Sequence, residues 1–385
     1  MIENVTDSVI RITQNDNIDL FESMYPVPDG VCYNSYVILD DKTAILDTMD
    51  SGVTDEWMDD IRKVLGDRNV DYIVIHHMEP DHSANISKIV KEHPEAKLVV
   101  NKMSSRMLDN YFAGIPADNR VIVEDGDTVC LGKHSLTFVM AQNVHWPEVM
   151  VSYDSFDKIL FSADAFGRFG PYDPSYEWDD EARRYYFNIV GKFGDYVVPV
   201  LDKAAALDIS AVCPLHGPVL DENLGKYLEL YRTWASYEPE TDGVFIAYTS
   251  VYGHTAEAAK MLADELSSMD TDVQIYDLSR THMSYAVSDA FRFNRTVLMT
   301  TTYENGIFPA MEWFVRELGH KNFRNRSVAV VDNGSWGPVA GKQIKELLSS
   351  MEGISIVEPS FSIKSAVKES DAEKIKQLAK ALSSI

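Results

Sequence analysis

The sequence has few cysteines, no long apolar run and no leader-like N-terminus. Its three cysteines, Cys32, Cys130 and Cys213, form no Cys-x-x-Cys pair, so neither a disulfide framework nor a four-cysteine metal site is expected. No apolar run approaches the roughly 18 residues that a membrane helix needs. The first residues, Met1-Ile2-Glu3-Asn4, lack the basic and then apolar order of a secretory signal. These absences predict a cytoplasmic protein without a membrane partner.

Positive charge is also scarce. Lys and Arg number 35 against 60 Asp and Glu, which gives a net charge of −25. So acidic a chain argues against nucleic acid and anionic membranes as partners. With 385 residues, of which 45% are hydrophobic and 25% charged, it has the composition of a globular protein of two or three domains.

The first part of the chain is rich in β-branched runs, such as residues 31–39, 43–47 and 72–75, with helical patterns between some of them. Residues 179–207 predict a long, broken helical region, and 224–236 a further helix. This order favours a layered α/β architecture. The polar stretch 237–243, which contains Pro239, marks a boundary. We therefore predict domains at 1–242 and 243–385.

After this boundary, strands and helices alternate regularly, which predicts a doubly wound parallel sheet of five strands. The predicted strands are 243–248, 273–278, 296–299, 327–331 and 354–359. The predicted helices are 254–268, 284–291, 310–319, 339–351 and 370–384.

Residues 76–83, His-His-Met-Glu-Pro-Asp-His-Ser, form a dense group of possible metal ligands directly after the strand at 72–75. Imidazoles and carboxylates also follow extended segments at three places downstream. A single histidine in a loop is usually a surface residue, but four separate loops with ligand types at strand ends indicate a metal site at one edge of a sheet. The candidate ligands are His77, Glu79, Asp81, His82, His145, Asp164 and His216.

Three loops of the second region predict a phosphate-bearing cofactor. The loop 249–255 leads from a strand into a helix, where backbone N–H groups and the helix dipole favour a phosphate. Two further strand ends carry loops at 301–306 and 333–337, in which Tyr303 and Trp336 could flank an aromatic ring. The candidate residues are Thr249, Ser250, Val251, Tyr252, Gly253, His254, Thr255, Thr301, Thr302, Tyr303, Glu304, Asn305, Gly306, Asn333, Gly334, Ser335, Trp336 and Gly337.

In order and type, these motifs resemble the flavodiiron version of the metallo-β-lactamase fold, over nearly the whole chain. Glu79 stands where the hydrolytic zinc relatives have His, and a carboxylate suits iron that cycles between ferrous and ferric states. Two departures, His76 where many relatives have Asn and Ala84 where Gly is common, remove no ligand. The resemblance implies a class A flavodiiron protein (A-type flavoprotein), with an N-terminal αββα sandwich followed by a flavodoxin-like domain.

The resemblance also implies the cofactors and their ligands. One iron takes His77, Glu79 and His145, the other takes Asp81, His82 and His216, and Asp164 bridges them, although the position of His82 is not always a direct ligand in the family. FMN binds in the flavodoxin-like half. Relatives often have Ser-Pro-Thr-Tyr where this chain has Thr-Thr-Thr-Tyr at 300–303, so that loop is less rigid here.

By resemblance the chain is an oxidoreductase that passes electrons from FMN to the irons and reduces O2 to water, NO to N2O, or both, protecting an anaerobe. The implied donor is rubredoxin or a reduced deazaflavin coenzyme, and the implied assembly is a head-to-tail homodimer or a tetramer. The alternative is a zinc hydrolase of the metallo-β-lactamase superfamily fused to a flavodoxin-like module, which metal analysis would distinguish.

Overall fold

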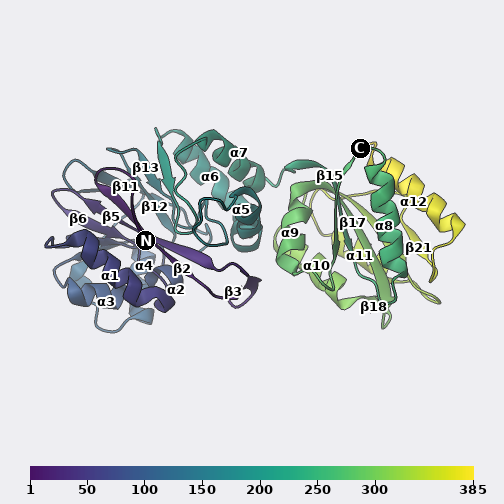
Figure 1. Ribbon diagram of the computed structural model, residues 1–385, viewed down its shortest axis with the longest axis horizontal. Helices are drawn as coiled ribbons and strands as arrows, with labels where there is room; N and C mark the ends of the chain where they lie inside the picture. The colour runs from purple at the N-terminus through teal and green to yellow at the C-terminus, as the bar shows by residue number, and fades with distance from the viewer. The chain divides into compact units, whose positions relative to one another are not determined.

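The computed structural model describes all residues from Met1 to Ile385. The chain divides into two compact units (Figure 1). Unit 1 comprises Met1–Tyr186 and Phe193–Arg232, and unit 2 comprises Phe187–Lys192 and Thr233–Ile385. The predicted domain boundary after Asp242 stays a prediction; strand β15 begins at Thr241, two residues before the predicted start of the second domain. No helix combines the length and the apolar character that crossing a bilayer requires.

Unit 1 is built on two β-sheets, which confirms the predicted sandwich. The first sheet has the order β1-β2-β5-β6-β7-β8-β9 and the second the order β10-β11-β12-β13-β14. The strands of the first sheet are β1 (Ile2–Asn4), β2 (Val9–Asp16), β5 (Val31–Leu39), β6 (Thr43–Leu46), β7 (Tyr72–Val74), β8 (Lys97–Val100) and β9 (Arg120–Ile122). Those of the second are β10 (Thr128–Cys130), β11 (Ser135–Met140), β12 (Met150–Asp154), β13 (Ile159–Phe161) and β14 (Ala211–Cys213).

Helices cover the outer faces of these sheets (Figure 1). Helix α1 shows why: Trp57, Ile61 and Leu65 recur at four-residue spacing and are buried. The helices of unit 1 are α1 (Thr54–Leu65), α2 (Pro80–Ser83), α3 (Ile86–Glu92), α4 (Lys102–Tyr111), α5 (Asp179–Tyr185), α6 (Gly194–Ala205) and α7 (Leu224–Ala235), and a hairpin joins β3 (Leu20–Phe21) to β4 (Tyr25–Pro26). A π-helical turn at Tyr186–Val190 interrupts the predicted 179–207 helix, as expected of a broken region.

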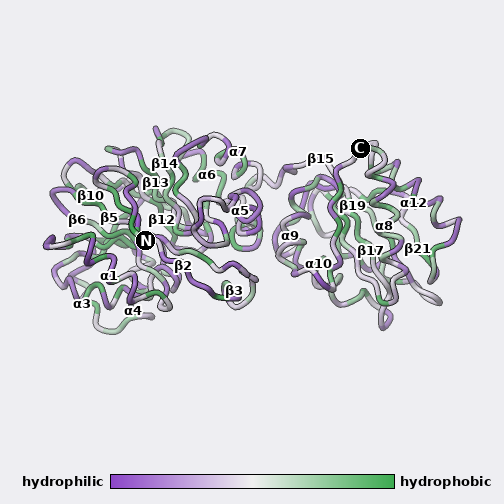
Figure 2. The backbone as a smooth tube through the Cα atoms, in the orientation of Figure 1, coloured by the Kyte–Doolittle hydropathy of each residue, from purple (hydrophilic) through white to green (hydrophobic).

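Unit 2 has the predicted doubly wound parallel sheet, in the order β16-β15-β17-β19-β20, with β21 also beside β19. Its strands are β15 (Thr241–Tyr248), β16 (Asp272–Asp277), β17 (Phe293–Tyr303), β18 (Gly306–Ile307), β19 (Ser327–Asn333), β20 (Ser355–Ile356) and β21 (Phe361–Ile363). Its helices are α8 (His254–Ser267), α9 (Met283–Arg292), α10 (Pro309–His320), α11 (Ala340–Leu348) and α12 (Glu369–Leu382). Figure 2 shows hydrophobic residues along the central strands β17 and β19.

The fifth strand of this sheet differs from the prediction. Residues 354–359 were expected to form one strand, but the edge is shared by the short strands β20 and β21, which both pair with β19. Pro359 lies between them and has no N–H to donate to a ladder. The polypeptide therefore returns to the edge only at Phe361, and the loop after β21 reaches the end of the sheet where the predicted FMN loops lie.

Candidate functional site

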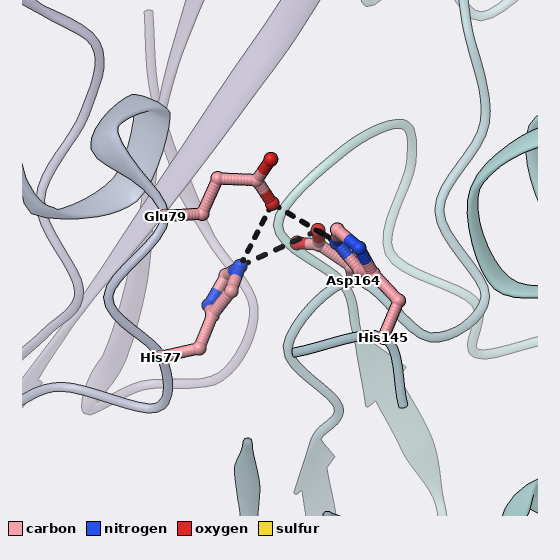
Figure 3. A group of neighbouring side chains, drawn as sticks. All are labelled: His77, Glu79, His145 and Asp164. Carbon is pink, nitrogen blue, oxygen red and sulfur yellow. Dashed lines mark hydrogen bonds and ion pairs between the residues drawn. The ribbon is translucent and has the colours of Figure 1, made fainter. Parts of the chain in front are cut away.

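The first group of predicted metal ligands comes together in unit 1. His77 and Glu79 follow β7, His145 follows β11 and Asp164 follows β13; their ligand atoms all lie within 4.8 Å of one another. The His145 Nε2 atom lies 2.9 Å from Glu79 Oε2 and 3.0 Å from Asp164 Oδ2. The His77 Nε2 atom lies 3.5 and 3.4 Å from the same two oxygens. Figure 3 shows these side chains pointing toward one another.

The second group consists of Asp81, His82 and His216. The Nε2 atoms of His82 and His216 lie 3.0 Å apart, and the Asp81 Oδ2 atom lies 3.3 and 3.4 Å from them. Asp164 adjoins this group as well, because its Oδ1 atom lies 3.3 Å from His82 Nε2. The two oxygens of one buried carboxylate thus face two different ligand groups.

These distances match the spacing of ligand atoms around a shared metal ion. Ligands about 2.1 Å from one ion lie about 3.0 Å apart when adjacent in an octahedron and about 3.4 Å apart in a tetrahedron. The distances in both groups fall close to these values. Several buried atoms also have no hydrogen-bond partner, namely His77 Nε2, Glu79 Oε2, Asp81 Oδ1 and Oδ2, and Asp164 Oδ1. These atoms converge as close ion pairs but lack well-directed hydrogen bonds, which fits bound cations.

Charge within the cluster supports the same interpretation. Burial opposes ionisation, but the neighbouring carboxylates outweigh it and raise the pKa of His82 and of His145 to about 10. Burial likewise opposes ionisation of Asp81 and Asp164, but the facing histidines hold the pKa of both carboxyls below the usual range. These raised pKa values favour the protonated forms of His82 and His145, and a bound metal ion would displace those protons.

A hydrogen bond orients His216 for coordination. Its Nδ1 atom lies 2.9 Å from the carbonyl oxygen of Cys32, which can only accept a hydrogen bond. The ring proton therefore sits on Nδ1, and the Nε2 lone pair faces the second group.

His76 lies outside both groups and anchors the ligand loop. Its backbone N–H donates to Asp47 Oδ1 at 2.8 Å, its Nδ1 lies 2.5 Å from Asp47 Oδ2, and its Nε2 lies 2.8 Å from Ser152 Oγ. All three side chains are buried. Asp47 directly follows strand β6 with φ of +57°, a conformation that Asp tolerates and that aims its carboxylate at the neighbouring strand end.

Sequence reasoning missed two further side chains at the cluster. The buried Tyr185 hydroxyl of α5 donates to Asp164 Oδ2 at 3.0 Å. Glu22, in the turn between β3 and β4, is partly open to solvent, but burial of its carboxyl and the adjacent Glu79 raise its pKa to about 7. Neither residue carried a motif: Tyr185 lies within a helical pattern, and Glu22 lies in a turn far from the other ligands in sequence.

The predicted cofactor loops of unit 2 line a cavity of about 600 Å³, the size of a small-molecule cofactor site. The structure places all the predicted residues in its wall except Thr249, Gly253 and Gly306. Gly253 precedes α8 with φ of +93°, where a residue with a side chain is strained, and its N–H donates to Ser250 Oγ at 3.1 Å.

The other two exceptions also lie at the cavity's edge of the sheet. The Thr249 hydroxyl, directly after β15, lies 2.7 Å from that of Thr300 in β17, and Gly306 begins β18. Sequence reasoning missed Ser365, which lines the cavity and whose hydroxyl lies 2.5 Å from that of Ser335. It follows β21, the strand that was predicted too early in the chain.

Comparison with known proteins supports both halves of this description. Residues 31–217 match the family model described as ODP family beta lactamase, and residues 246–377 match the Flavodoxin model. A nitric oxide reductase of Moorella thermoacetica is 27% identical over 97% of this chain and 96% of that protein. An anaerobic nitric oxide reductase flavorubredoxin of Salmonella arizonae is also 27% identical, over 83% of this chain and 68% of that protein.

Solved structures agree over the full length. A flavo di-iron protein variant from Thermotoga maritima is 25% identical, with a TM-score of 0.90 over 100% of this chain and 98% of that one. This chain is a flavodiiron protein. The rubredoxin oxygen:oxidoreductase of Desulfovibrio gigas, 23% identical, shares the fold with a TM-score of 0.92 over 100% of this chain and 98% of that one.

As a flavodiiron protein, the chain is an oxidoreductase whose cofactors are FMN and a pair of non-haem irons. The residues fit both cofactors. Convergent, unpaired buried ligand atoms suit the irons, and a cavity bounded by three strand-end loops and the N-terminus of α8 suits a flavin with its phosphate.

Proposed function

We propose that this flavodiiron protein reduces O2 to water, NO to N2O, or both, at the metal cluster of unit 1. The observation that carries the proposal is the placement of Asp164, whose two oxygens face separate groups of buried ligands. A carboxylate in this position can hold two ions close enough to act on one small substrate. When bound, FMN supplies electrons to the iron pair, and the irons supply them to the gas.

We assign the ligands residue by residue on the same geometry. His77, Glu79 and His145 would hold one iron, Asp81, His82 and His216 the other, and Asp164 would bridge them. Support for His82 as a direct ligand comes from its Nε2 atom, which lies within 3.3 Å of Asp81, Asp164 and His216. Tyr185 would orient the bridging carboxylate through its hydroxyl, since that group donates to Oδ2.

The FMN pocket would use loop backbone for the phosphate and aromatic side chains for the ring. Thr255 lies in the first turn of α8 and Ser250 in the loop before it, where their hydroxyls can join the helix N–H groups in binding phosphate. Tyr303 and Trp336 would flank the isoalloxazine. Trp336 is 94% exposed, so no other residue of unit 2 covers the aromatic face that the isoalloxazine ring would stack on.

Assembly and electron donor belong to the same proposal. Tyr252 and Trp336, 90% and 94% exposed on the FMN loops, are large apolar groups that a second subunit could bury, as in a head-to-tail homodimer. The donor would be rubredoxin or a reduced deazaflavin coenzyme. A cytoplasmic location is in keeping with the three free cysteines, a state that reducing compartments maintain. The domain boundary after Asp242 is part of the proposal.

Turnover measured anaerobically tests the proposal. The protein is loaded with iron and FMN, assayed for both, and supplied with O2 or NO using reduced rubredoxin and, separately, reduced deazaflavin coenzyme. We expect about two irons and one FMN per chain and rapid consumption of at least one gas. A zinc-loaded protein that hydrolyses esters or lactams but consumes neither gas would overturn the proposal.

A further inference from the structure

Unit 1 contains a small cavity beside the loops that carry the metal ligands. Its volume is about 30 Å³, and it lies between β11, β12 and β13 of the second sheet and helix α6. Val151 and Leu160 contribute the sheet side of its wall, and Leu201 and Ala204 the helix side. All four side chains are buried.

The wall of this cavity is almost wholly hydrocarbon. Ser162 and Tyr231 contribute the hydroxyl groups, and both hydroxyls are engaged within the chain: Ser162 Oγ donates to the Ala165 carbonyl at 2.7 Å, and Tyr231 Oη accepts from the Phe166 N–H at 2.7 Å. A water molecule needs two to four polar partners to occupy a cavity, and apolar cavities of this kind stay dry. An apolar gas needs no such partners and gains by leaving water.

The cavity adjoins the metal cluster through the backbone that carries two of the proposed ligands. Val144 directly precedes His145, and Ala165 and Phe166 directly follow Asp164. One side of each ligand loop therefore faces the cluster, and neighbouring residues of the same loops form the cavity wall.

We infer that this cavity binds one molecule of a small apolar gas, O2 or NO, and holds it next to the metal cluster. The inference rests on the proposed function for the identity of the gas, but not for the binding itself. A gas held here raises the local concentration of substrate, so it lowers KM for the gas and leaves kcat unchanged.

Xenon is the probe, because it is apolar and binds dry cavities of proteins. Crystals of the iron- and FMN-loaded protein are pressurised with xenon, and binding in solution is followed by xenon NMR. Ala204→Val places two methyl groups into the cavity. Its matched control is Ala205→Val, the same change one residue further along α6, where the side chain is exposed and outside the cavity wall.

We expect xenon in the cavity of the wild type and of Ala205→Val. Because one extra methylene in a filled apolar pocket changes binding by about tenfold or more, Ala204→Val should bind xenon at least about tenfold more weakly. The same variant should show a raised KM for the gas, with kcat and iron content unchanged. Val200→Ile, which adds a single methyl group to the wall, should give a smaller effect in the same direction and guards against misfolding of Ala204→Val.

The outcomes separate the two proposals. Absence of xenon from the wild-type cavity, or equal xenon binding by Ala204→Val and Ala205→Val, overturns the inference. A folded variant that no longer binds xenon but keeps the wild-type KM for the gas contradicts the proposal that the cavity supplies gas to the metal cluster. Loaded wild-type protein that binds xenon but consumes neither O2 nor NO overturns the proposed function and, with it, the assignment of the gas.

Discussion

The metal cluster of unit 1 consists of buried, ionisable side chains, whereas the FMN pocket of unit 2 is lined by strand-end loops whose aromatic side chains face solvent. His77, His82 and His216 are 0% exposed, and Trp336 is 94% exposed. A buried charged cluster without its ions is costly, since ligand atoms lose water and gain no partner. An open pocket of backbone and aromatic groups remains hydrated when its cofactor leaves. The comparison therefore predicts that the folding of unit 1 depends on its metal far more than the folding of unit 2 depends on FMN.

The largest effect is expected from Asp164→Ala. It removes the one carboxylate that faces both ligand groups, so consumption of O2 and NO should be abolished and iron content should fall. Reduction of FMN by the donor should remain, because the pocket of unit 2 is untouched. Gas uptake, metal analysis and flavin absorbance check the three outcomes. The control is Asp202→Ala, an exposed carboxylate on α6; retained gas uptake by Asp164→Ala would contradict the assignment.

Removing each cofactor in turn tests directly whether the stability of unit 1 depends on iron more than the stability of unit 2 depends on FMN. Stripping iron by an anaerobic chelator should lower the unfolding temperature of unit 1 by roughly 10 °C, as expected for a loss of several kcal/mol in a unit of this size. Removal of FMN should lower the unfolding temperature of unit 2 by a smaller amount. Differential scanning calorimetry of the holo, iron-free and FMN-free proteins measures both shifts. Equal shifts would refute the contrast between the two sites.

Asp47→Asn tests whether the anchor of the ligand loop matters. Asp47 contacts both the backbone and the ring of His76, which directly precedes His77. Loss of such outer contacts typically weakens metal binding about 10- to 100-fold, so iron affinity should fall within that range while FMN affinity is unchanged. Competition with a chelator measures the iron affinity. Asp41→Asn, in an exposed turn of the same unit, is the control and should match the wild type.

Trp336→Ala is the corresponding change in the open pocket. Loss of one stacking surface should weaken the binding of FMN by about tenfold and leave the iron content unaltered. Fluorescence titration of the FMN-free protein measures the affinity. Trp313→Ala serves as the control because Trp313 is 48% exposed on α10 and lies outside the pocket wall. An unchanged FMN affinity in Trp336→Ala would remove Trp336 from the proposed site.

The smallest effect concerns a buried histidine away from the metal. Burial lowers the pKa of His134, but its contact with Asp154, 2.9 Å away, outweighs burial and raises it. The stabilisation is therefore fully present below the unfolded pKa of about 6.5 and is lost as pH rises through the folded value. The free energy of unfolding of the wild type should exceed that of His134→Gln by roughly 1–3 kcal/mol at acidic pH, because the contact is buried, and the difference should shrink at alkaline pH. Urea unfolding measures it, with the exposed His320→Gln as control.

Much of the fold could be predicted from sequence, because the signals are local. Strands β5 and β11 are rich in β-branched and aromatic residues, and helix α1 carries its buried residues at helical spacing. The alternation of strands and helices after Gly243 specifies a doubly wound sheet. The fifth strand was placed wrongly because the residues 354–359 look like a strand, whereas Pro359 interrupts the pairing that only the neighbouring strand β19 reveals.

The ligand types that follow the strand ends, from His77 to His216, can be read directly from the sequence, as can the glutamate at position 79 that favours iron. The tertiary structure decided how those ends meet. It placed the two oxygens of Asp164 toward different groups, brought Tyr185 to that carboxylate and paired Asp47 with His76. The physical reason is the separation along the chain of the residues that interact. A ligand's chemistry and its strand are encoded within a few residues, but contacts between loops separated by tens of residues depend on the packing of both sheets.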